Sequence, residues 1–219
     1  MGKLIVLEGS DGSGKATQTS RLFERLQNLG IRTMRVSFPN YESESSALIK
    51  MYLRGDFGAT AESVNPYAAS TFCAVDRFAS FQTWKNFYEG DGIVLADRYI
   101  GSNMAHQSAK LKRKADREKF LNWVYDFEFK RLRLPHPDLT FFLDMPPEIA
   151  AMLRRRRGRE DIHESDALYM KKSYNAYREI AKKFDWKVIN CAAGNFTKSA
   201  VDIHDEIFRA VEALLIGAP

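Results

Sequence analysis

The feature that most constrains the fold is a glycine-rich turn near the start of the chain, Gly9-Ser10-Asp11-Gly12-Ser13-Gly14-Lys15. A short apolar run, Leu4–Leu7, comes directly before it, and an amphipathic segment, Thr17–Leu29, follows it and stops at Gly30. This order predicts a strand, a loop and a helix. In such a loop successive backbone N–H groups converge on phosphate oxygens, and Lys15 adds a positive charge. The turn therefore indicates a P-loop that binds the phosphates of a nucleotide.

The residue after Lys15 departs from the usual P-loop pattern. A Ser or Thr hydroxyl normally contacts Mg²⁺ at this position, and here the residue is Ala16. Thr17 lies about 100° further round the helix, so its hydroxyl does not simply replace the missing ligand. We expect phosphate binding to be retained, because it depends mainly on backbone N–H groups, and metal affinity or catalytic rate to be reduced.

Five short apolar runs recur between longer segments of helical periodicity, which predicts an α/β fold. Together with the glycine-rich turn, we expect this fold to be of the P-loop NTP hydrolase type. The fold contains a five-stranded parallel sheet with helices on both faces. The predicted strands are Leu4–Leu7, Thr33–Phe38, Ile93–Ala96, Leu139–Leu143 and Lys187–Asn190. Such sheets bind ligands beyond the carboxyl ends of their strands, where the sequence places Gly9, Phe38, Asp97 and Asp144.

Composition narrows the class of protein. The chain has 219 residues, 45% of them hydrophobic, and no repeat or composition break, which predicts one domain over residues 1–219. Its two cysteines, Cys73 and Cys191, have no CxxC spacing, so neither a zinc site nor a disulfide framework is indicated. No apolar stretch is long enough for a membrane span or a signal peptide, and a cytoplasmic protein is expected. The net charge of +5 favours anionic partners in general, and nucleic-acid binding is an alternative supported by charge alone.

An acidic residue at a neighbouring strand end is expected to hold Mg²⁺, directly or through water. Asp97 and Asp144 are the candidates. We favour Asp97 as the metal ligand, because Arg98 follows at once and places a guanidinium for phosphate at the same strand end.

A basic cluster, Arg154-Arg155-Arg156-Arg157-Gly158-Arg159, follows a helix predicted to begin near Pro147. It is consistent with a solvated helix face or a nucleic-acid patch. Alongside a P-loop it also predicts a mobile lid, at about residues 154–163, whose arginines neutralise the transferred phosphoryl group and exclude water.

Aromatic and polar residues in the middle of the chain favour a pocket for a phosphate-bearing acceptor with a planar base. Phe38 ends the second predicted strand, and Phe72 and Arg77 lie on a helix predicted to begin near Asn65. Ser102, Asn103, His106 and Gln107 follow the Asp97-Arg98-Tyr99 turn.

These motifs, in this order and spacing, resemble the thymidylate kinase family over essentially the whole chain. The resemblance rests on the glycine-rich turn, Phe38-Pro39, Asp76-Arg77, Asp97-Arg98-Tyr99 and Arg155-Arg156-Arg157-Gly158-Arg159. It implies transfer of the ATP γ-phosphoryl group to the 5′-phosphate of dTMP, with Mg²⁺ as cofactor and a homodimer as the assembly.

The resemblance also implies roles for individual residues. The ATP-binding residues would be Gly9, Ser10, Asp11, Gly12, Ser13, Gly14, Lys15, Ala16 and Thr17. Asp11 would approach the acceptor sugar, Phe38 and Phe72 the base, Arg77 the thymine side and Arg98 the acceptor phosphate, with Ser102, Asn103 and Gln107 completing the substrate site. The implied catalytic residues are Lys15, Asp97, Arg98, Arg155, Arg157 and Arg159. Some members carry a catalytic arginine at the position of Gly12, so this chain resembles the type that takes its arginine from the lid.

Two positions depart from the family pattern in the acceptor site. Ser37 stands where the family usually carries an arginine for the acceptor phosphate, and Cys73 stands where an aromatic residue stacks on thymine, one residue after Phe72. With Ala16, these departures leave two alternatives open: a kinase for another nucleoside monophosphate or a nucleoside, and a nucleotide-binding protein with weakened catalysis.

Overall fold

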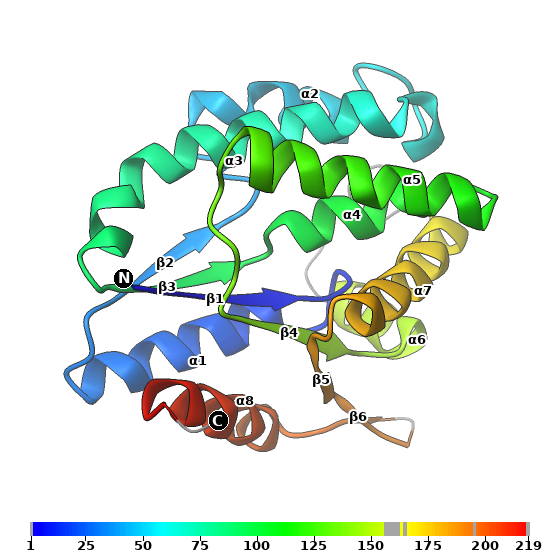
Figure 1. The fold of residues 1–219 in the computed structure, drawn as a ribbon. Coiled ribbons are helices and arrows are strands. Elements are labelled where there is room, and N and C mark those ends of the chain that lie inside the picture. Colours follow the sequence, from blue (N-terminus) through cyan, green and yellow to red (C-terminus); the bar gives the residue numbers. More distant parts are fainter. Residues whose placement is uncertain (1, 156–162, 164–165, 195, 218–219) are drawn as a thin grey trace.

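The computed structural model describes residues 2–155, 163, 166–194 and 196–217. A parallel sheet of five strands in the order β2-β3-β1-β4-β5 forms its centre, which confirms the predicted fold class (Figure 1). The strands of this sheet are β1 (Lys3–Glu8), β2 (Thr33–Ser37), β3 (Ile93–Asp97), β4 (Leu139–Asp144) and β5 (Lys187–Asn190), and a small antiparallel pair, β6 (Ala192–Ala193) and β7 (Phe196–Thr197), follows. The helices are α1 (Lys15–Asn28), η1 (Glu44–Ser46), α2 (Ala47–Arg54), η2 (Ala61–Ser63), α3 (Pro66–Glu89), α4 (Ile100–Ser108), α5 (Lys114–Tyr125), the π-helical turn η3 (Asp126–Arg131), α6 (Pro147–Arg155), α7 (Ala167–Lys183) and α8 (Ala200–Leu215).

The central strands β1, β3 and β4 are mainly apolar because helices cover both faces of the sheet there. Leu4 and Val6 of β1 point into a core shared with α3, α4, α5 and α7, whereas Ile5 and Leu7 point into a second core shared with α1 and α8. Figure 1 shows these two helical layers on opposite sides of the sheet. Side chains alternate between the faces of a strand, so a strand covered on both faces is a nearly continuous apolar run, with its polar residues mainly at the ends.

Helix starts follow local capping signals. α1 begins at Lys15, two residues before the predicted start, because Gly14 caps it in the left-handed conformation with φ 89°. α3 begins at Pro66, as predicted, and the Asn65 side chain accepts a hydrogen bond from the Tyr67 N–H at 2.8 Å. Among the described residues, no helix combines the length and the apolar character needed to cross a membrane.

The register of the sheet brings the predicted functional segments to one edge. Leu7 of β1 and Ser37 of β2 both align with Asp97 of β3. Glu8 aligns with Phe142 of β4. The loops after β1, β2 and β3 therefore start side by side, at the carboxyl end of the sheet where α/β proteins bind ligands.

Candidate active site

The glycine-rich loop after β1 has the geometry of a phosphate cradle. The Lys15 Nζ donates hydrogen bonds to the carbonyl oxygens of Gly9 and Ser10, each at 2.9 Å, so the lysine is held over the loop. Gly9 is needed for close packing, since a Cβ there would lie 2.7 Å from the Ser13 Oγ. The buried hydroxyls of Ser10 and Ser13 have no hydrogen-bond partner within the described residues. These unsatisfied groups fit a loop built to receive phosphate oxygens.

Lys15 is buried, with 6% of its surface exposed. Burial and the nearby Arg98 guanidinium lower the pKa of Lys15 to about 8, against the opposing effect of Asp11 and Asp97. A phosphate bound in the loop would supply the anion that this ammonium lacks. Ala16 and Thr17, by contrast, are exposed on the first turn of α1.

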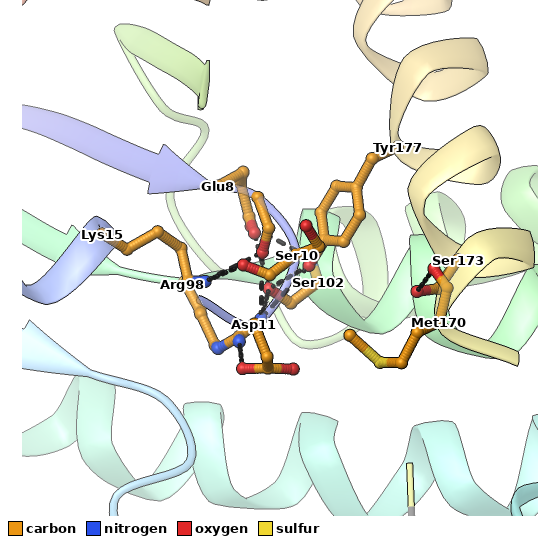
Figure 2. A network of polar contacts seen from close by, with 10 residues as sticks. Glu8, Ser10, Asp11, Lys15, Arg98, Ser102, Met170, Ser173 and Tyr177 are labelled. Carbon is orange, nitrogen blue, oxygen red and sulfur yellow. Dashed lines mark hydrogen bonds and ion pairs between the residues drawn. The ribbon is translucent and has the colours of Figure 1, made fainter. Parts of the chain in front are cut away.

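Arg98 joins the loop to the region beyond β3. Its Nη1 donates to the Ser102 Oγ at 3.1 Å and to the Tyr177 hydroxyl at 3.2 Å, and its Nη2 forms an ion pair with Asp11 (Figure 2). The Arg98 backbone has a positive φ of 68°, which is uncommon for a residue with a side chain. Its N–H donates to the Leu7 carbonyl at 3.0 Å and holds this conformation against the end of β1.

Two acids flank β1 at the carboxyl end of the sheet. Asp97 ends β3 and lies close enough to Lys15 and Arg98 to favour their charged forms. Asp144 ends β4, and its Oδ1 accepts a hydrogen bond from the Tyr174 hydroxyl at 2.7 Å. Of the two, Asp97 has the surroundings expected of a metal ligand beside bound phosphate.

Magnesium in phosphoryl-transfer sites is commonly bound by one or two carboxylates together with substrate phosphates and water. No three His, Cys, Asp or Glu side chains among the described residues gather closely enough to hold a metal by themselves. Asp97, which lies beside the glycine-rich loop, fits a magnesium site made of one carboxylate and substrate phosphates, and the methyl group of Ala16 offers no further ligand.

A cavity with a volume of about 110 Å³ lies next to Arg98 and contains most of the predicted acceptor residues. Its walls include Asp11, Phe38, Arg77, Arg98, Ser102, Asn103, His106, Gln107 and His163. Phe72 is not part of this wall, and its ring packs on Phe57 with centroids 5.7 Å apart. Cys73 lines the cavity instead. One residue is about 100° of helical turn, so Phe72 and Cys73 face different directions on α3.

Arg77, which lines this cavity, belongs to a buried ion pair. Arg77 binds both carboxylate oxygens of Glu128, from Nε to Oε2 at 2.6 Å and from Nη2 to Oε1 at 2.7 Å. Asn103 donates its Nδ2 to the same Oε1 at 3.1 Å, which leaves its buried Oδ1 without a partner among the described residues. No sequence pattern indicated Glu128, because this residue lies in the π-helical turn η3, 51 residues from Arg77.

Two histidines form another part of the wall. The rings of His106 and His163 stack with centroids 5.3 Å apart, and burial lowers the pKa of both, that of His106 to about 4. The Tyr52 hydroxyl bonds to the Nε2 of His163 at 2.7 Å and accepts from the Lys110 Nζ at 2.9 Å. His163 is thereby fixed against α2 and α4.

Asp76 also lines the cavity, and several other predicted residues lie outside the described residues. Asp76 organises the loop after β2, where it accepts hydrogen bonds from the Asn40 N–H at 2.9 Å and the Ser45 hydroxyl at 2.7 Å. Helix α6 begins at Pro147, as predicted, and ends at Arg155. Arg157 and Arg159, with most of the predicted lid at residues 154–163, lie outside the described residues.

Glu8 is a further residue that the sequence did not mark. It ends β1, is wholly buried, and accepts hydrogen bonds from Tyr99 and Ser102 at the start of α4. Burial raises the pKa of its carboxyl group, against the lowering effect of the Ser102 hydroxyl and Arg98. Charged residues are rarely buried unless they are paired, so a glutamate at a strand end reads from sequence as exposed.

Comparison with known proteins identifies the family of the chain. The family model described as thymidylate kinase matches residues 7–207. A thymidylate kinase of Mycobacterium tuberculosis is 34% identical over 187 residues, covering 81% of this chain and 85% of that protein. A thymidylate kinase of Halothermothrix orenii is 32% identical over 224 residues, covering 98% and 99%. The fold is similar to that of the solved thymidylate kinase of Candida albicans, with a TM-score of 0.74 at 23% identity over 97% of this chain and 92% of that one. The chain belongs to the thymidylate kinase family.

Proposed function

We propose that the γ-phosphoryl group of ATP passes to the acceptor between the P-loop and the neighbouring cavity, at Asp11, Lys15 and Arg98. The overall reaction is that of a thymidylate kinase, the ATP-dependent phosphorylation of dTMP to dTDP. The observation that supports this location is the position of Arg98, which contacts Asp11 in the P-loop and Ser102 in the wall of the acceptor cavity. One guanidinium thus borders both nucleotide sites.

In this proposal Lys15 and the loop N–H groups bind the ATP phosphates, and Arg98 binds the acceptor phosphate. Asp97, together with ATP phosphate oxygens, would hold Mg²⁺, which neutralises phosphate charge when bound. Transfer is in line and needs no covalent enzyme intermediate, because positioning and charge neutralisation are sufficient. Trapping of a phosphorylated enzyme would contradict this mechanism.

The predicted lid remains part of the proposal. Residues 154–163 would close over the site within a single kinase domain of residues 1–219, and Arg155, Arg157 and Arg159 would supply the cations that the P-loop lacks at Gly12. Replacing Arg155 and Arg157 by alanine should lower kcat more than it raises KM, since the charge acts mainly in the transition state. An unchanged kcat would show that these arginines form a solvent-exposed surface and take no part in phosphoryl transfer.

The acceptor cavity favours a base that carries an N–H on the edge facing Asn103. Glu128 holds the Asn103 amide so that its Oδ1 is an unsatisfied acceptor. Thymine and uracil can donate an N3–H to such an oxygen, whereas the N3 of cytosine carries no hydrogen. Two acceptors would then meet, and a site with buried polar groups discriminates strongly against such a mismatch.

A coupled assay of ADP release with dTMP, dUMP, dCMP and thymidine tests the acceptor directly. We expect kcat/KM for dTMP to exceed that for dCMP by about 100-fold or more. Thymidine should be poor because it brings no phosphate to Arg98. Equal rates with dTMP, dCMP and thymidine would exclude the proposed acceptor site. Turnover should vanish in Lys15→Ala, and negligible turnover of the unmodified chain at high Mg²⁺ would favour a protein that binds nucleotide without efficient catalysis.

We also propose a homodimer. Helix α3 presents Val75 and Phe78 to solvent, 53% and 42% exposed, and the two lie three residues apart on one side of the helix. A second copy of the chain packed on this face would cover them. Light scattering should give the mass of a dimer for the unmodified chain and that of a monomer for Val75→Asp with Phe78→Asp. A monomer in both cases would refute the assembly. A cytoplasmic location stays a prediction.

A further inference from the structure

We infer that Glu8 is a positioning residue for phosphoryl transfer, because it holds Arg98 through the Ser102 hydroxyl in the orientation that meets the acceptor phosphate. The inference rests on the proposed role of Arg98. Glu8 does not face the cavity that holds the acceptor residues, and it would act through its neighbours.

The contacts of Glu8 converge on the first turn of α4. Its Oε1 accepts hydrogen bonds from the backbone N–H groups of Tyr99 and Ser102, at 2.9 and 3.0 Å, and its Oε2 accepts from the Ser102 Oγ at 2.5 Å. Tyr99 caps α4 without a hydrogen bond from its own side chain, so the Glu8 carboxylate satisfies the open N–H groups there. Gly101 permits the approach, since a Cβ at Gly101 would lie 2.8 Å from Oε1.

The direction of these hydrogen bonds explains why a carboxylate is needed. An ionised carboxylate only accepts, so the Ser102 hydroxyl hydrogen points to Glu8. The Ser102 oxygen is then free to accept from two donors, the Arg98 Nη1 at 3.1 Å and the Tyr177 hydroxyl at 2.8 Å (Figure 2). By accepting the Ser102 hydroxyl hydrogen, Glu8 thus leaves the Ser102 oxygen as the acceptor that orients the Arg98 guanidinium.

Charge supports the same link. Glu8 is completely buried, and its ionised form is favoured by Arg98 and Lys15. A buried carboxylate without such partners would be strongly unfavourable. The Glu8 carboxylate therefore compensates the positive charges of Arg98 and Lys15 from a position outside the cavity that would hold the acceptor.

The variant Glu8→Gln tests the inference with little change in shape. The Gln side-chain oxygen can still accept from both backbone N–H groups, but its amide nitrogen donates where the carboxylate accepted. The Ser102 hydroxyl must then turn, and it can no longer accept from both Arg98 and Tyr177. We expect kcat/KM for dTMP to fall about 10- to 100-fold, while KM for ATP stays within about twofold.

A double-mutant cycle with Ser102→Ala separates positioning from general stability. If Glu8 acts through Ser102, the double variant should lose no more kcat/KM for dTMP than the more severe single variant. Losses that multiply would overturn the inference. Should Glu8→Gln fail to fold, Ser102→Ala and Tyr177→Phe still break the same chain of contacts and must each lower kcat/KM for dTMP.

Asp138→Asn provides the matched control. Asp138 also binds β1 through a carboxylate, accepting from the Leu4 N–H at 2.8 Å and the Lys3 Nζ at 3.0 Å, but at the opposite end of the strand. It should leave the kinetics unchanged. If Glu8→Gln lowers only the melting temperature, as a structural anchor would, the inference is wrong.

Arg98→Ala distinguishes this failure from a failure of the proposed function. A mild effect of Arg98→Ala on kcat/KM for dTMP would refute the role of Arg98 itself. A severe effect of Arg98→Ala with a mild effect of Glu8→Gln would refute only the positioning by Glu8.

Discussion

Glu128→Gln should both destabilise the protein and weaken its choice of acceptor. The Glu128 carboxylate is the only counter-charge that the described residues place in hydrogen-bond contact with the Arg77 guanidinium, and the two side chains are 0% and 4% exposed. The substitution keeps the size of the side chain and removes its charge. Arg77 would then stay buried with its charge uncompensated.

The geometry allows the size of the effect to be estimated. Removing one partner of a buried ion pair costs about 3–5 kcal/mol, and in a domain of this size each kcal/mol lowers Tm by about 2–4 °C. We therefore expect a decrease in Tm of about 6–20 °C. The exposed pair of Arg25 and Asp205, at 3.0 Å, is the matched control, and Asp205→Asn should change stability by less than about 1 kcal/mol.

Thermal unfolding and steady-state kinetics should be measured on the same samples. Glu128 also fixes the Asn103 amide, so the ratio of kcat/KM for dTMP to that for dCMP should fall in Glu128→Gln. Replacing the whole pair, as Arg77→Met with Glu128→Leu, should recover much of the lost Tm, because apolar side chains can substitute for a buried ion pair. That variant should not recover dTMP selectivity.

Two results would refute this reasoning. If Glu128→Gln lowers Tm no more than Asp205→Asn does, then Arg77 is more exposed to water than the structure indicates. An unchanged preference for dTMP over dCMP would show that the orientation of Asn103 does not select the base.

Three further changes test the P-loop and its surroundings. Because burial lowers the pKa of Lys15 to about 8 in the enzyme without nucleotide, kcat/KM for ATP should be constant below pH 8 and fall as the pH rises through it. The control is Lys110, whose pKa is also lowered to about 8. If Lys110→Met no longer shows the fall at alkaline pH, Lys110 and not Lys15 is the group that causes it. Ala16→Thr should reduce the Mg²⁺ concentration needed for half-maximal rate, and no change would show that the hydroxyl is dispensable. Gly101→Ala places a Cβ 2.3 Å from the Trp186 ring and should destabilise the fold by about 1–3 kcal/mol in urea unfolding, whereas unchanged stability would mean that the ring moves freely.

The sheet could be predicted from sequence because its strands are short, mainly apolar runs between longer segments of helical periodicity. The ranges 33–38, 139–143 and 187–190 were expected as strands, and each agrees with an observed strand to within one residue at either end. The P-loop was equally accessible, since its glycines, its lysine and its flanking elements are contiguous. In both cases the information is local in the chain.

The acceptor cavity was less predictable because its contacts are not local. Glu128 lies in a π-helical turn whose register no simple periodicity describes, and its partner Arg77 is 51 residues away. Phe72 was expected in the wall and Cys73 lies there, a difference of one residue that only the rotation of α3 decides. For Glu8 the sequence pattern indicated an exposed residue, since a charged residue that ends an apolar run is normally exposed, whereas the structure buries it.

The hydrogen bond between Tyr52 and His163 has a consequence for folding. It joins residues 111 positions apart, and the bond from the Tyr169 hydroxyl to the His106 carbonyl spans 63. Closing such long loops has an entropic cost, whereas the hydrogen bond from Lys15 to the Gly9 carbonyl within the P-loop spans only 6 positions. A chain that has opened locally at the acceptor wall can therefore keep its ATP cradle. Protection of the chain from proteolysis should consequently depend more on dTMP than on ATP at equal saturation, because dTMP requires the distant segments to be assembled.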